Sequence, residues 1–170
     1  MEREALRAVQ EPLKDRYRAE PDAALITLKA EGRLGEGVTC SVQTGKALAT
    51  AGLHPATGGN GLSACSGDML LEALVACAGV TMGAVATAIG VVLRSGSVHV
   101  EGDLDFRGTL GVAKDAPVGF QRIRLRFDLD TDATAEQLDT LIRLTERYCV
   151  VYQTLRQPPE MTVTRNAAAA

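Results

Sequence analysis

The sequence contains no tryptophan, and aromatic residues make up only 4% of it. Proteins that bind single-stranded nucleic acids stack the bases on aromatic side chains, and this chain lacks such a platform. It also lacks a cluster of basic residues, and its net charge is −3. Neutralising a run of phosphates requires clustered lysine and arginine. We therefore expect no nucleic-acid partner.

The sequence also lacks a Cys-x-x-Cys motif, although it contains four cysteines. They are Cys40, Cys65, Cys77 and Cys149. Zinc ribbons and thioredoxin-like sites depend on such pairs, so the sequence predicts neither. A zinc site built from scattered cysteines with His54 and His99 is geometrically possible, but the spacing disfavours it. We expect no metal and no bound cofactor.

The first 20 residues carry charges throughout and contain no apolar segment of the kind found in signal peptides. We therefore expect a cytoplasmic protein whose thiols are kept reduced by the compartment. The composition, 46% hydrophobic and 23% charged, is typical of a globular protein. A length of 170 residues is enough for one domain with a core of its own, so residues 1–170 are interpreted as a single domain.

One long apolar segment is present, because residues 73–93 contain no charged side chain. It is long enough to span a membrane, and Gly79 and Gly83 form a small-residue motif that can pair helices. The segment is nevertheless rich in alanine, glycine and threonine, which makes it weakly hydrophobic for a membrane span. Amphipathic strand patterns flank it closely on both sides. We therefore expect a buried helix of a soluble protein rather than a membrane anchor.

Patterns along the rest of the chain predict strands and helices in blocks. Apolar and polar residues alternate over residues 24–32, 37–45, 46–52, 97–108, 120–130 and 161–165, which predicts strands. Helices are predicted over residues 2–18, 67–89, 135–148 and 149–156. This order predicts an α+β fold with a mostly antiparallel sheet.

The ends of the two main helices carry capping residues. Ser66 is a candidate N-cap of the apolar helix, and Asp68 places a negative charge in its first turn. Gly90 is expected to end that helix. Thr134 and Gln137 have the spacing of a capping box at the start of the next one.

A helix that is apolar all round needs cover on every side. We expect one six-stranded sheet to cover one side of it. A second subunit is the simplest cover for the other side, so the sequence predicts a homodimer.

Two segments resemble the OsmC/Ohr family of osmotically induced and organic hydroperoxide resistance proteins. The segment SGDMLLEALVACAGVTM, residues 66–82, is similar to the central-helix signature of the family, in which an acidic residue and a small-residue run lead to a cysteine. The segment LTERYCVVYQTL, residues 144–155, resembles its second signature, a helix that ends at a cysteine. Gly32 and Arg33 fit the same order of elements. The resemblance covers residues 24–165 and leaves residues 1–20 as an N-terminal extension.

The resemblance implies an intertwined α+β homodimer with active sites at the subunit interface. It also implies a stress-response enzyme that reduces organic hydroperoxides and is restored by dithiol reductants such as lipoylated proteins. By the same resemblance, Cys77 is the peroxidatic cysteine and Cys149 the resolving one. Arg33 matches the arginine that pairs with the thiolate, and Asp68 matches an acidic residue that is usually glutamate. The second cysteine is commonly followed by proline in the family, whereas Val150 follows it here.

The chemistry of a thiol peroxidase requires a thiolate, because the thiolate is the nucleophile. Cys77 lies about ten residues into its predicted helix, too far from the N-terminus for the helix dipole to stabilise the thiolate. A cation is therefore expected near its sulfur. Arg33 is the first candidate and Arg147 the alternative. The competing interpretation is that Cys77 is an inert core residue.

Helix geometry bears on the two acids of the apolar helix. At 100° per residue, Asp68 points about 180° away from Cys77 and Glu72 about 140° away. Neither carboxylate is expected to reach the sulfur, although Asp68 can anchor an arginine from another strand. Cys65, in the loop before the helix, is the backup resolving cysteine.

Three functions are compatible with these residues. The first is a cysteine-dependent organic hydroperoxide reductase. The second is a non-catalytic protein that binds a small apolar molecule on the same fold, and the third is a thiol redox sensor.

Overall fold

The fold is described by a computed structural model that covers residues 2–5, 8, 19, 31–34, 39–44, 47–111 and 113–165. For residues 31–34, 39–44, 47 and 48 only the backbone is described. Residues 3–5 are helical, and the remainder of the helix predicted over residues 2–18 lies mostly outside the described residues. Residues 24–30 of the first predicted strand and the tail 166–170 lie outside them as well.

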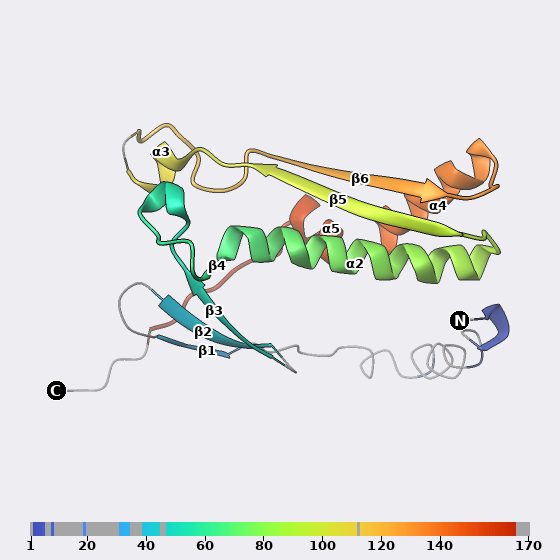
Figure 1. The fold of residues 1–170 in the computed structure, drawn as a ribbon, viewed down its shortest axis with the longest axis horizontal. Coiled ribbons are helices and arrows are strands. Elements are labelled where there is room, and N and C mark those ends of the chain that lie inside the picture. Colours follow the sequence, from blue (N-terminus) through green and yellow to red (C-terminus); the bar gives the residue numbers. More distant parts are fainter. Residues whose placement is uncertain are drawn as a thin grey trace.

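Four strands of the N-terminal sheet are described, in the order β1-β2-β3-β4. They are β1 (Glu31–Leu34), β2 (Thr39–Thr44), β3 (Ala47–Gly52) and β4 (Ala64–Cys65). The first three strands form an antiparallel meander, and the two-residue β4 pairs parallel with β3. In Figure 1 this sheet lies beside the start of the long helix α2 and extends away from the second sheet.

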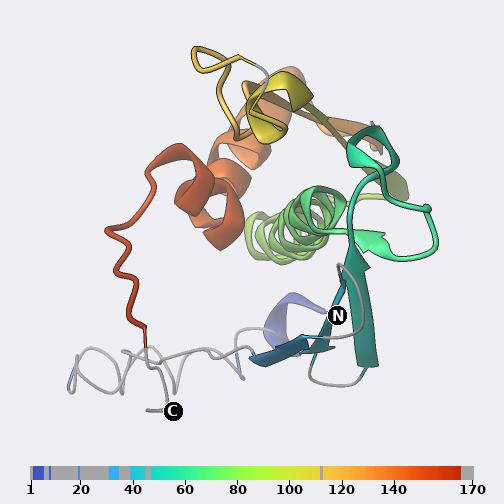
Figure 2. The same cartoon turned by 90° about the vertical axis from the view of Figure 1, so that its left-hand side faces the viewer.

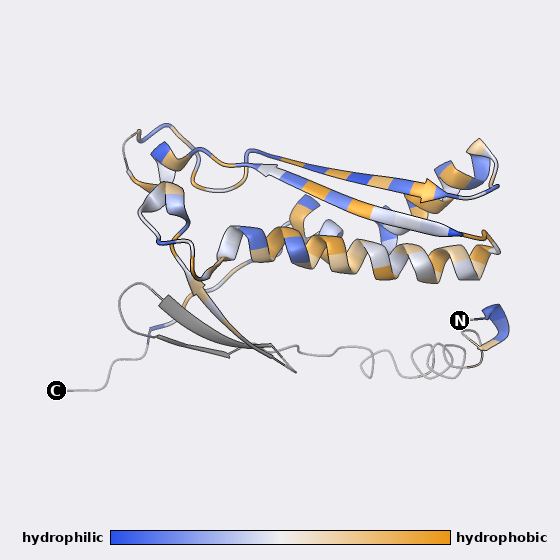
Figure 3. Cartoon of the chain, viewed as in Figure 1, coloured by the Kyte–Doolittle hydropathy of each residue, from blue (hydrophilic) through white to orange (hydrophobic). Residues whose placement is uncertain are grey.

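The second sheet is an antiparallel ribbon of β5 (Ser95–Asp103) and β6 (Arg122–Asp130). Its side chains alternate strictly between the two faces, which is visible as alternating colours along β6 in Figure 3. Ile123, Leu125 and Phe127 face α2, whereas the arginines between them face outward. On the outer face Arg124 pairs with both Glu101 and Asp103. These exposed pairs contribute little stability, and they agree with the register of the ribbon, in which Glu101 lies opposite Arg124.

The long helix α2 (Ser66–Ile89) runs along the ribbon. Cys65, rather than the predicted Ser66, occupies its N-cap position and makes no capping hydrogen bond with its side chain. Asp68 lies in the first turn as predicted, and Gly90 ends the helix in the left-handed conformation with φ of 75°.

Two helices complete the layer against α2, and Figure 2 shows them on one side of it. They are α4 (Ala135–Tyr148), which begins with the predicted capping box of Thr134 and Gln137, and α5 (Val150–Arg156). Leu141 of α4 is fully buried against Met82, Val85 and Ala86 of α2. A second cluster of Leu74, Ala78 and Cys149 is buried where α2 meets α5 and the ribbon. The predicted α+β class is confirmed, and the short elements η2 (Pro55–Thr57) and α3 (Phe106–Thr109) lie in the connections.

Three predictions about the sheets are wrong. The described strands form two separate sheets, not one of six strands. The strand predicted over residues 97–108 ends at Asp103, because the Asp105 side chain caps α3 by accepting a hydrogen bond from the backbone N–H of Arg107. Residues 161–165 are not a strand, and Met161 and Val163 are 82% and 93% exposed, because no described strand lies alongside to pair with them.

Against the described part of the chain, the helix α2 is buried on one face only. Val80, at the middle of the opposite face, is 76% exposed. By length and composition α2 is the one described helix that meets the criterion for crossing a membrane, which the core helix of a soluble protein also meets. Within the described residues this face has no cover, and the sequence predicted that a second subunit would supply it.

Candidate active site

The two cysteines singled out by the sequence lie in contact. Cys77 is in the middle of α2, where its side chain is partly buried and faces the start of α5. Cys149 lies between α4 and α5 and is 1% exposed. The two thiols lie close enough for each to shift the pKa of the other by hydrogen bonding, and both are free rather than joined in a disulfide. The fold thus places two reduced sulfurs within reach of each other.

A break in the helix at Cys149 creates this arrangement. The backbone at Cys149 is extended, with φ of −73° and ψ of 107°, so α4 ends there and α5 begins with the next residue. The Cys149 N–H still donates to the Thr145 carbonyl and closes α4. The first N–H groups of α5 have no carbonyl partner within their own helix. Those of Val150 and Val151 donate to the Cys77 sulfur instead.

The surroundings move the pKa of the Cys77 thiol below its ordinary value. Burial by itself raises the pKa. The N–H of Val151, the Cys149 thiol, the hydroxyl of Thr81 and the N–H of Val150 all donate to the sulfur, and together they outweigh burial. Hydrogen bonds to the charged form favour that form, so Cys77 is the more readily ionised thiol.

The same surroundings raise the pKa of Cys149. Burial is the largest cause, and the neighbouring Cys77 thiolate raises it further by disfavouring a second negative charge. The N–H groups of Tyr152 and Val151 act in the opposite direction but do not outweigh it. The pair is therefore asymmetric: Cys77 is the thiol that ionises first, and Cys149 is the thiol that stays protonated longer and donates to it.

The expected cation at Cys77 is not required for this shift, because peptide N–H and hydroxyl groups produce it. Arg33 lies on β1 opposite Ser41, and its side chain is outside the described residues. Arg147 extends over the ring of Tyr148, 5.6 Å from the ring centroid. It is not among the groups that move the pKa of Cys77.

The two acids of α2 lie away from the thiol pair. Asp68 and Glu72 line a hollow of about 370 Å³ together with Leu71, Val75 and Val100. Cys77 does not line this hollow, in agreement with the helical geometry that places both acids on another face. Among the described residues, neither acid forms an ion pair.

The remaining cysteines take no part in the described pair. Cys65 precedes α2, and twelve residues of helix place it about 18 Å from Cys77. It therefore cannot resolve a sulfenic acid on Cys77 within one chain. Cys40 is on β2, with only its backbone described. The described part of the chain contains no group of three histidine, cysteine or acidic residues arranged to hold a metal.

Three groups at the site escaped the sequence-based prediction: the Thr81 hydroxyl and the N–H groups of Val150 and Val151. Two features of the sequence could have identified these groups. Thr81 follows Cys77 by four residues, which places both on one helix face. A helix predicted to begin immediately after Cys149 has free N–H groups at its start.

Comparisons with known proteins agree with this fold and order of elements. Residues 58–164 match the family model described as OsmC-like protein. No curated protein matches the chain in sequence.

Solved structures of the same fold come from several bacteria. An OsmC-like protein from Mycoplasma pneumoniae superposes with a TM-score of 0.66 at 16% identity, covering 78% of this chain and 89% of that one. An organic hydroperoxide resistance protein from Elizabethkingia anophelis gives a TM-score of 0.63 at 15% identity, with coverage of 79% and 91%. An organic hydroperoxide resistance protein OsmC from Legionella pneumophila gives 0.61 at 18% identity, with coverage of 79% and 92%. Since the family model spans more than half of the residues, the chain belongs to the OsmC-like protein family.

Proposed function

We propose that the protein is a thiol peroxidase that reduces organic hydroperoxides through Cys77 and Cys149. The observation that carries the proposal is the asymmetry of two contacting thiols, one with a lowered and one with a raised pKa. The attacking thiol must be ionised, which a lowered pKa favours. The resolving thiol reacts only after the sulfenic acid has formed, so a raised pKa that keeps it protonated suits its role. The organic hydroperoxide resistance proteins of similar fold support the same reaction.

The reaction follows from these protonation states. The Cys77 thiolate attacks the terminal peroxide oxygen, the O–O bond breaks, and the departing alkoxide takes up a proton from solvent to become an alcohol. Cys77 is then a sulfenic acid. Cys149 loses its proton and attacks the Cys77 sulfur, water leaves, and a disulfide forms. An external dithiol, such as a lipoylated protein, reduces the disulfide by thiol exchange and is itself oxidised.

We further propose that the working form is a cytoplasmic homodimer. Ala73, Ala76, Val80, Gly83 and Thr87 form a stripe of small residues on the open face of α2, with exposed or partly exposed side chains. Its alternating spacing of three and four residues suits close packing against an identical helix. Cys77 lies at the border between this stripe and the buried face, so a second copy would cover the open side of the thiol. Arg33 of that copy is the proposed cation, and Asp68 its anchor.

Hydroperoxide consumption tests the reaction. With cumene hydroperoxide and dihydrolipoamide, the wild type and Cys65→Ser should turn over at equal rates, and Cys77→Ser should be inactive. Cys65→Ser is the matched control because it removes a free thiol that lies outside the pair. Equal rates for wild type and Cys77→Ser would overturn the proposal and favour a non-catalytic function.

A further inference from the structure

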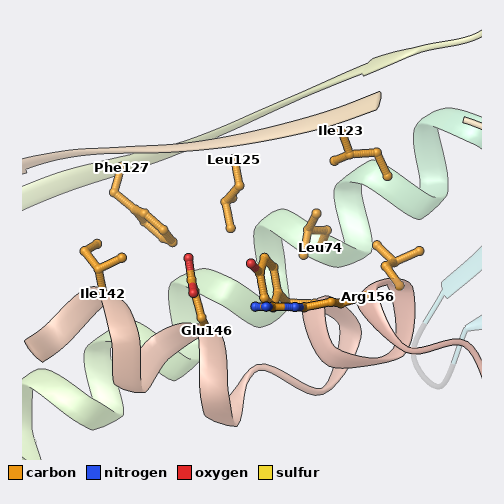
Figure 4. Close-up of a pocket in the computed structure, with 9 residues that line it drawn as sticks. Leu74, Ile123, Leu125, Phe127, Ile142, Glu146 and Arg156 are labelled. Carbon is orange, nitrogen blue, oxygen red and sulfur yellow. The ribbon is translucent and has the colours of Figure 1, made fainter. Parts of the chain in front are cut away.

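A second cavity lies behind the thiol pair, between the ribbon, α4 and α5. Its volume is about 350 Å³, within the range of small-molecule sites. Figure 4 shows Leu125 and Phe127 pointing into it from β6, and Leu74 reaching it from α2. These side chains make one wall of the cavity apolar.

The cavity is separate from the reactive sulfurs. Neither Cys77 nor Cys149 lines it. Leu74 and Tyr152 line it and also pack against Cys149, so they stand between the cavity and the buried thiol. A molecule in the cavity would contact the apolar cluster without being exposed to attack by the thiolate.

Two opposite charges reach the cavity from different helices. Glu146 of α4 is partly buried, whereas Arg156 of α5 is exposed, and Figure 4 shows both side chains below Leu125. No ion pair joins them, and within the described part of the chain neither has another ion-pair partner. The cavity therefore offers a ligand one hydrogen-bond acceptor, the Glu146 carboxylate, and one donor, the Arg156 guanidinium, and the two charges sum to zero.

This arrangement selects the head group of a ligand. A carboxylate would be attracted by Arg156 and repelled by Glu146, and an ammonium group would meet the reverse. A hydroxyl is neutral, and it can donate to the carboxylate while it accepts from the guanidinium. We propose that this cavity is a binding site for a small neutral alcohol with an apolar aliphatic or aromatic body.

The inference goes beyond the proposed function and does not depend on it, because the lining residues alone carry it. The proposed reaction releases an alcohol of the same class, which gives the cavity a natural ligand in the product. Binding can be measured on the Cys77→Ser protein, which cannot turn over a hydroperoxide. A failed binding test and a failed activity test are therefore distinguishable.

The test compares three probes that share one tail: 1-hexanol, hexanoate and hexylammonium. Methyl NMR of Ile123 and Leu125 in the Cys77→Ser protein follows each titration. Hexanol should shift these methyl signals saturably, and the two charged probes should bind at least about tenfold more weakly. Replacing butanol with pentanol and then hexanol should tighten binding by about fourfold for each buried methylene.

Variants that remove one of the two charges lining the cavity give the decisive comparison. Glu146→Gln should make hexanoate the tightest probe, and Arg156→Gln should do the same for hexylammonium. Arg143→Gln is the matched control, because Arg143 is exposed on α4 and does not line the cavity. It should leave the order of the three probes unchanged.

Several results would overturn the proposal. Absence of methyl shifts with hexanol would mean that the cavity takes no such ligand. Tighter binding of hexanoate or hexylammonium to the parent protein would assign the site to a charged ligand. An order of probes that is the same in Glu146→Gln, Arg156→Gln and Arg143→Gln would exclude the two charges from recognition.

Discussion

Cys77 and Cys149 carry the same functional group and differ only in what surrounds them. Both are partly or fully buried, and burial raises the pKa of each. Cys77 receives hydrogen bonds from two peptide N–H groups, a hydroxyl and a thiol, whereas Cys149 donates to a neighbour that carries the negative charge. Environment rather than residue type therefore decides which of the two thiols ionises more readily.

The first prediction concerns the pH dependence of this pair. Alkylation by iodoacetamide depends on the thiolate, so the Cys77 rate should reach half of its maximum at a pH below the ordinary thiol pKa. The Cys149 rate should reach half of its maximum at a pH above the ordinary thiol pKa, because its pKa is raised. Mass spectrometry of the two peptides across the pH range measures both.

The pKa shift of Cys77 also affects stability. Its thiolate is favoured in the folded state, so its contribution is full above the unfolded pKa and is lost as the pH falls through the lowered folded value. The pKa of Cys149 is raised instead, so its contribution to stability is full below the unfolded pKa and is lost as the pH rises through the raised folded value.

In the alkylation experiment, a half-maximal pH for Cys149 below that for Cys77 would contradict the assignment of Cys77 as the nucleophile.

At the scale of elements, the start of α5 supplies the donors that matter. Val150 is the first residue of α5, and its N–H is one of the groups that lower the pKa of Cys77. The resemblance to the OsmC/Ohr family implies a proline at this position, and proline has no N–H to donate. The thiolate of this chain therefore has one donor that a proline at this position would remove.

The second prediction tests that donor with Val150→Pro. Proline suits the first position of a helix, and the extended backbone of Cys149 suits the residue before a proline. The substitution should slow alkylation of Cys77 at pH 7 by less than about tenfold, the factor that corresponds to ~1.4 kcal/mol, because the Val150 N–H has the smallest effect of the four donors. At pH 10 the effect should be small.

Val150→Ala is the control for this substitution, because it removes most of the exposed side chain and keeps the N–H. It should react like the wild type at both pH values. Equal slowing of Val150→Pro at pH 7 and pH 10 would indicate altered access to the sulfur instead of a lost donor.

Elements with a strong local pattern were predictable from sequence. The β6 strand alternates along its whole length, and α4 carries its own capping box, so the sequence predicted both closely. The end of β5 depends on the cap at Asp105, and a last strand at Met161 needs a partner strand, so local pattern failed there. The contact of Cys77 with Cys149 came from resemblance, because no periodicity links residues so distant in sequence.

At the scale of the whole molecule, the exposed apolar face of α2 leads us to expect that a second copy of the chain packs against it. The third prediction is a homodimer at micromolar concentration that Val80→Arg dissociates. An arginine in the centre of a helix–helix interface leaves a buried charge unpaired, which should weaken the dimer by about a hundredfold or more. Sedimentation velocity measures the change.

Val92→Arg is the matched control for assembly. Val92 is 74% exposed, as Val80 is 76% exposed, but it follows α2 and lies outside the stripe. Its replacement should leave the dimer intact. A wild-type protein that sediments as a monomer, or equal effects of the two substitutions, would contradict an interface on this face of α2.

The most direct test of the central claim is peptide mapping after oxidation. The reduced protein is treated with one equivalent of cumene hydroperoxide, the free thiols are alkylated, and the peptides are separated without reductant. The account predicts a disulfide between Cys77 and Cys149, with Cys40 and Cys65 alkylated as free thiols. A disulfide that joins Cys65 to Cys77, or a Cys77 that stays alkylatable after the hydroperoxide is added, would contradict it.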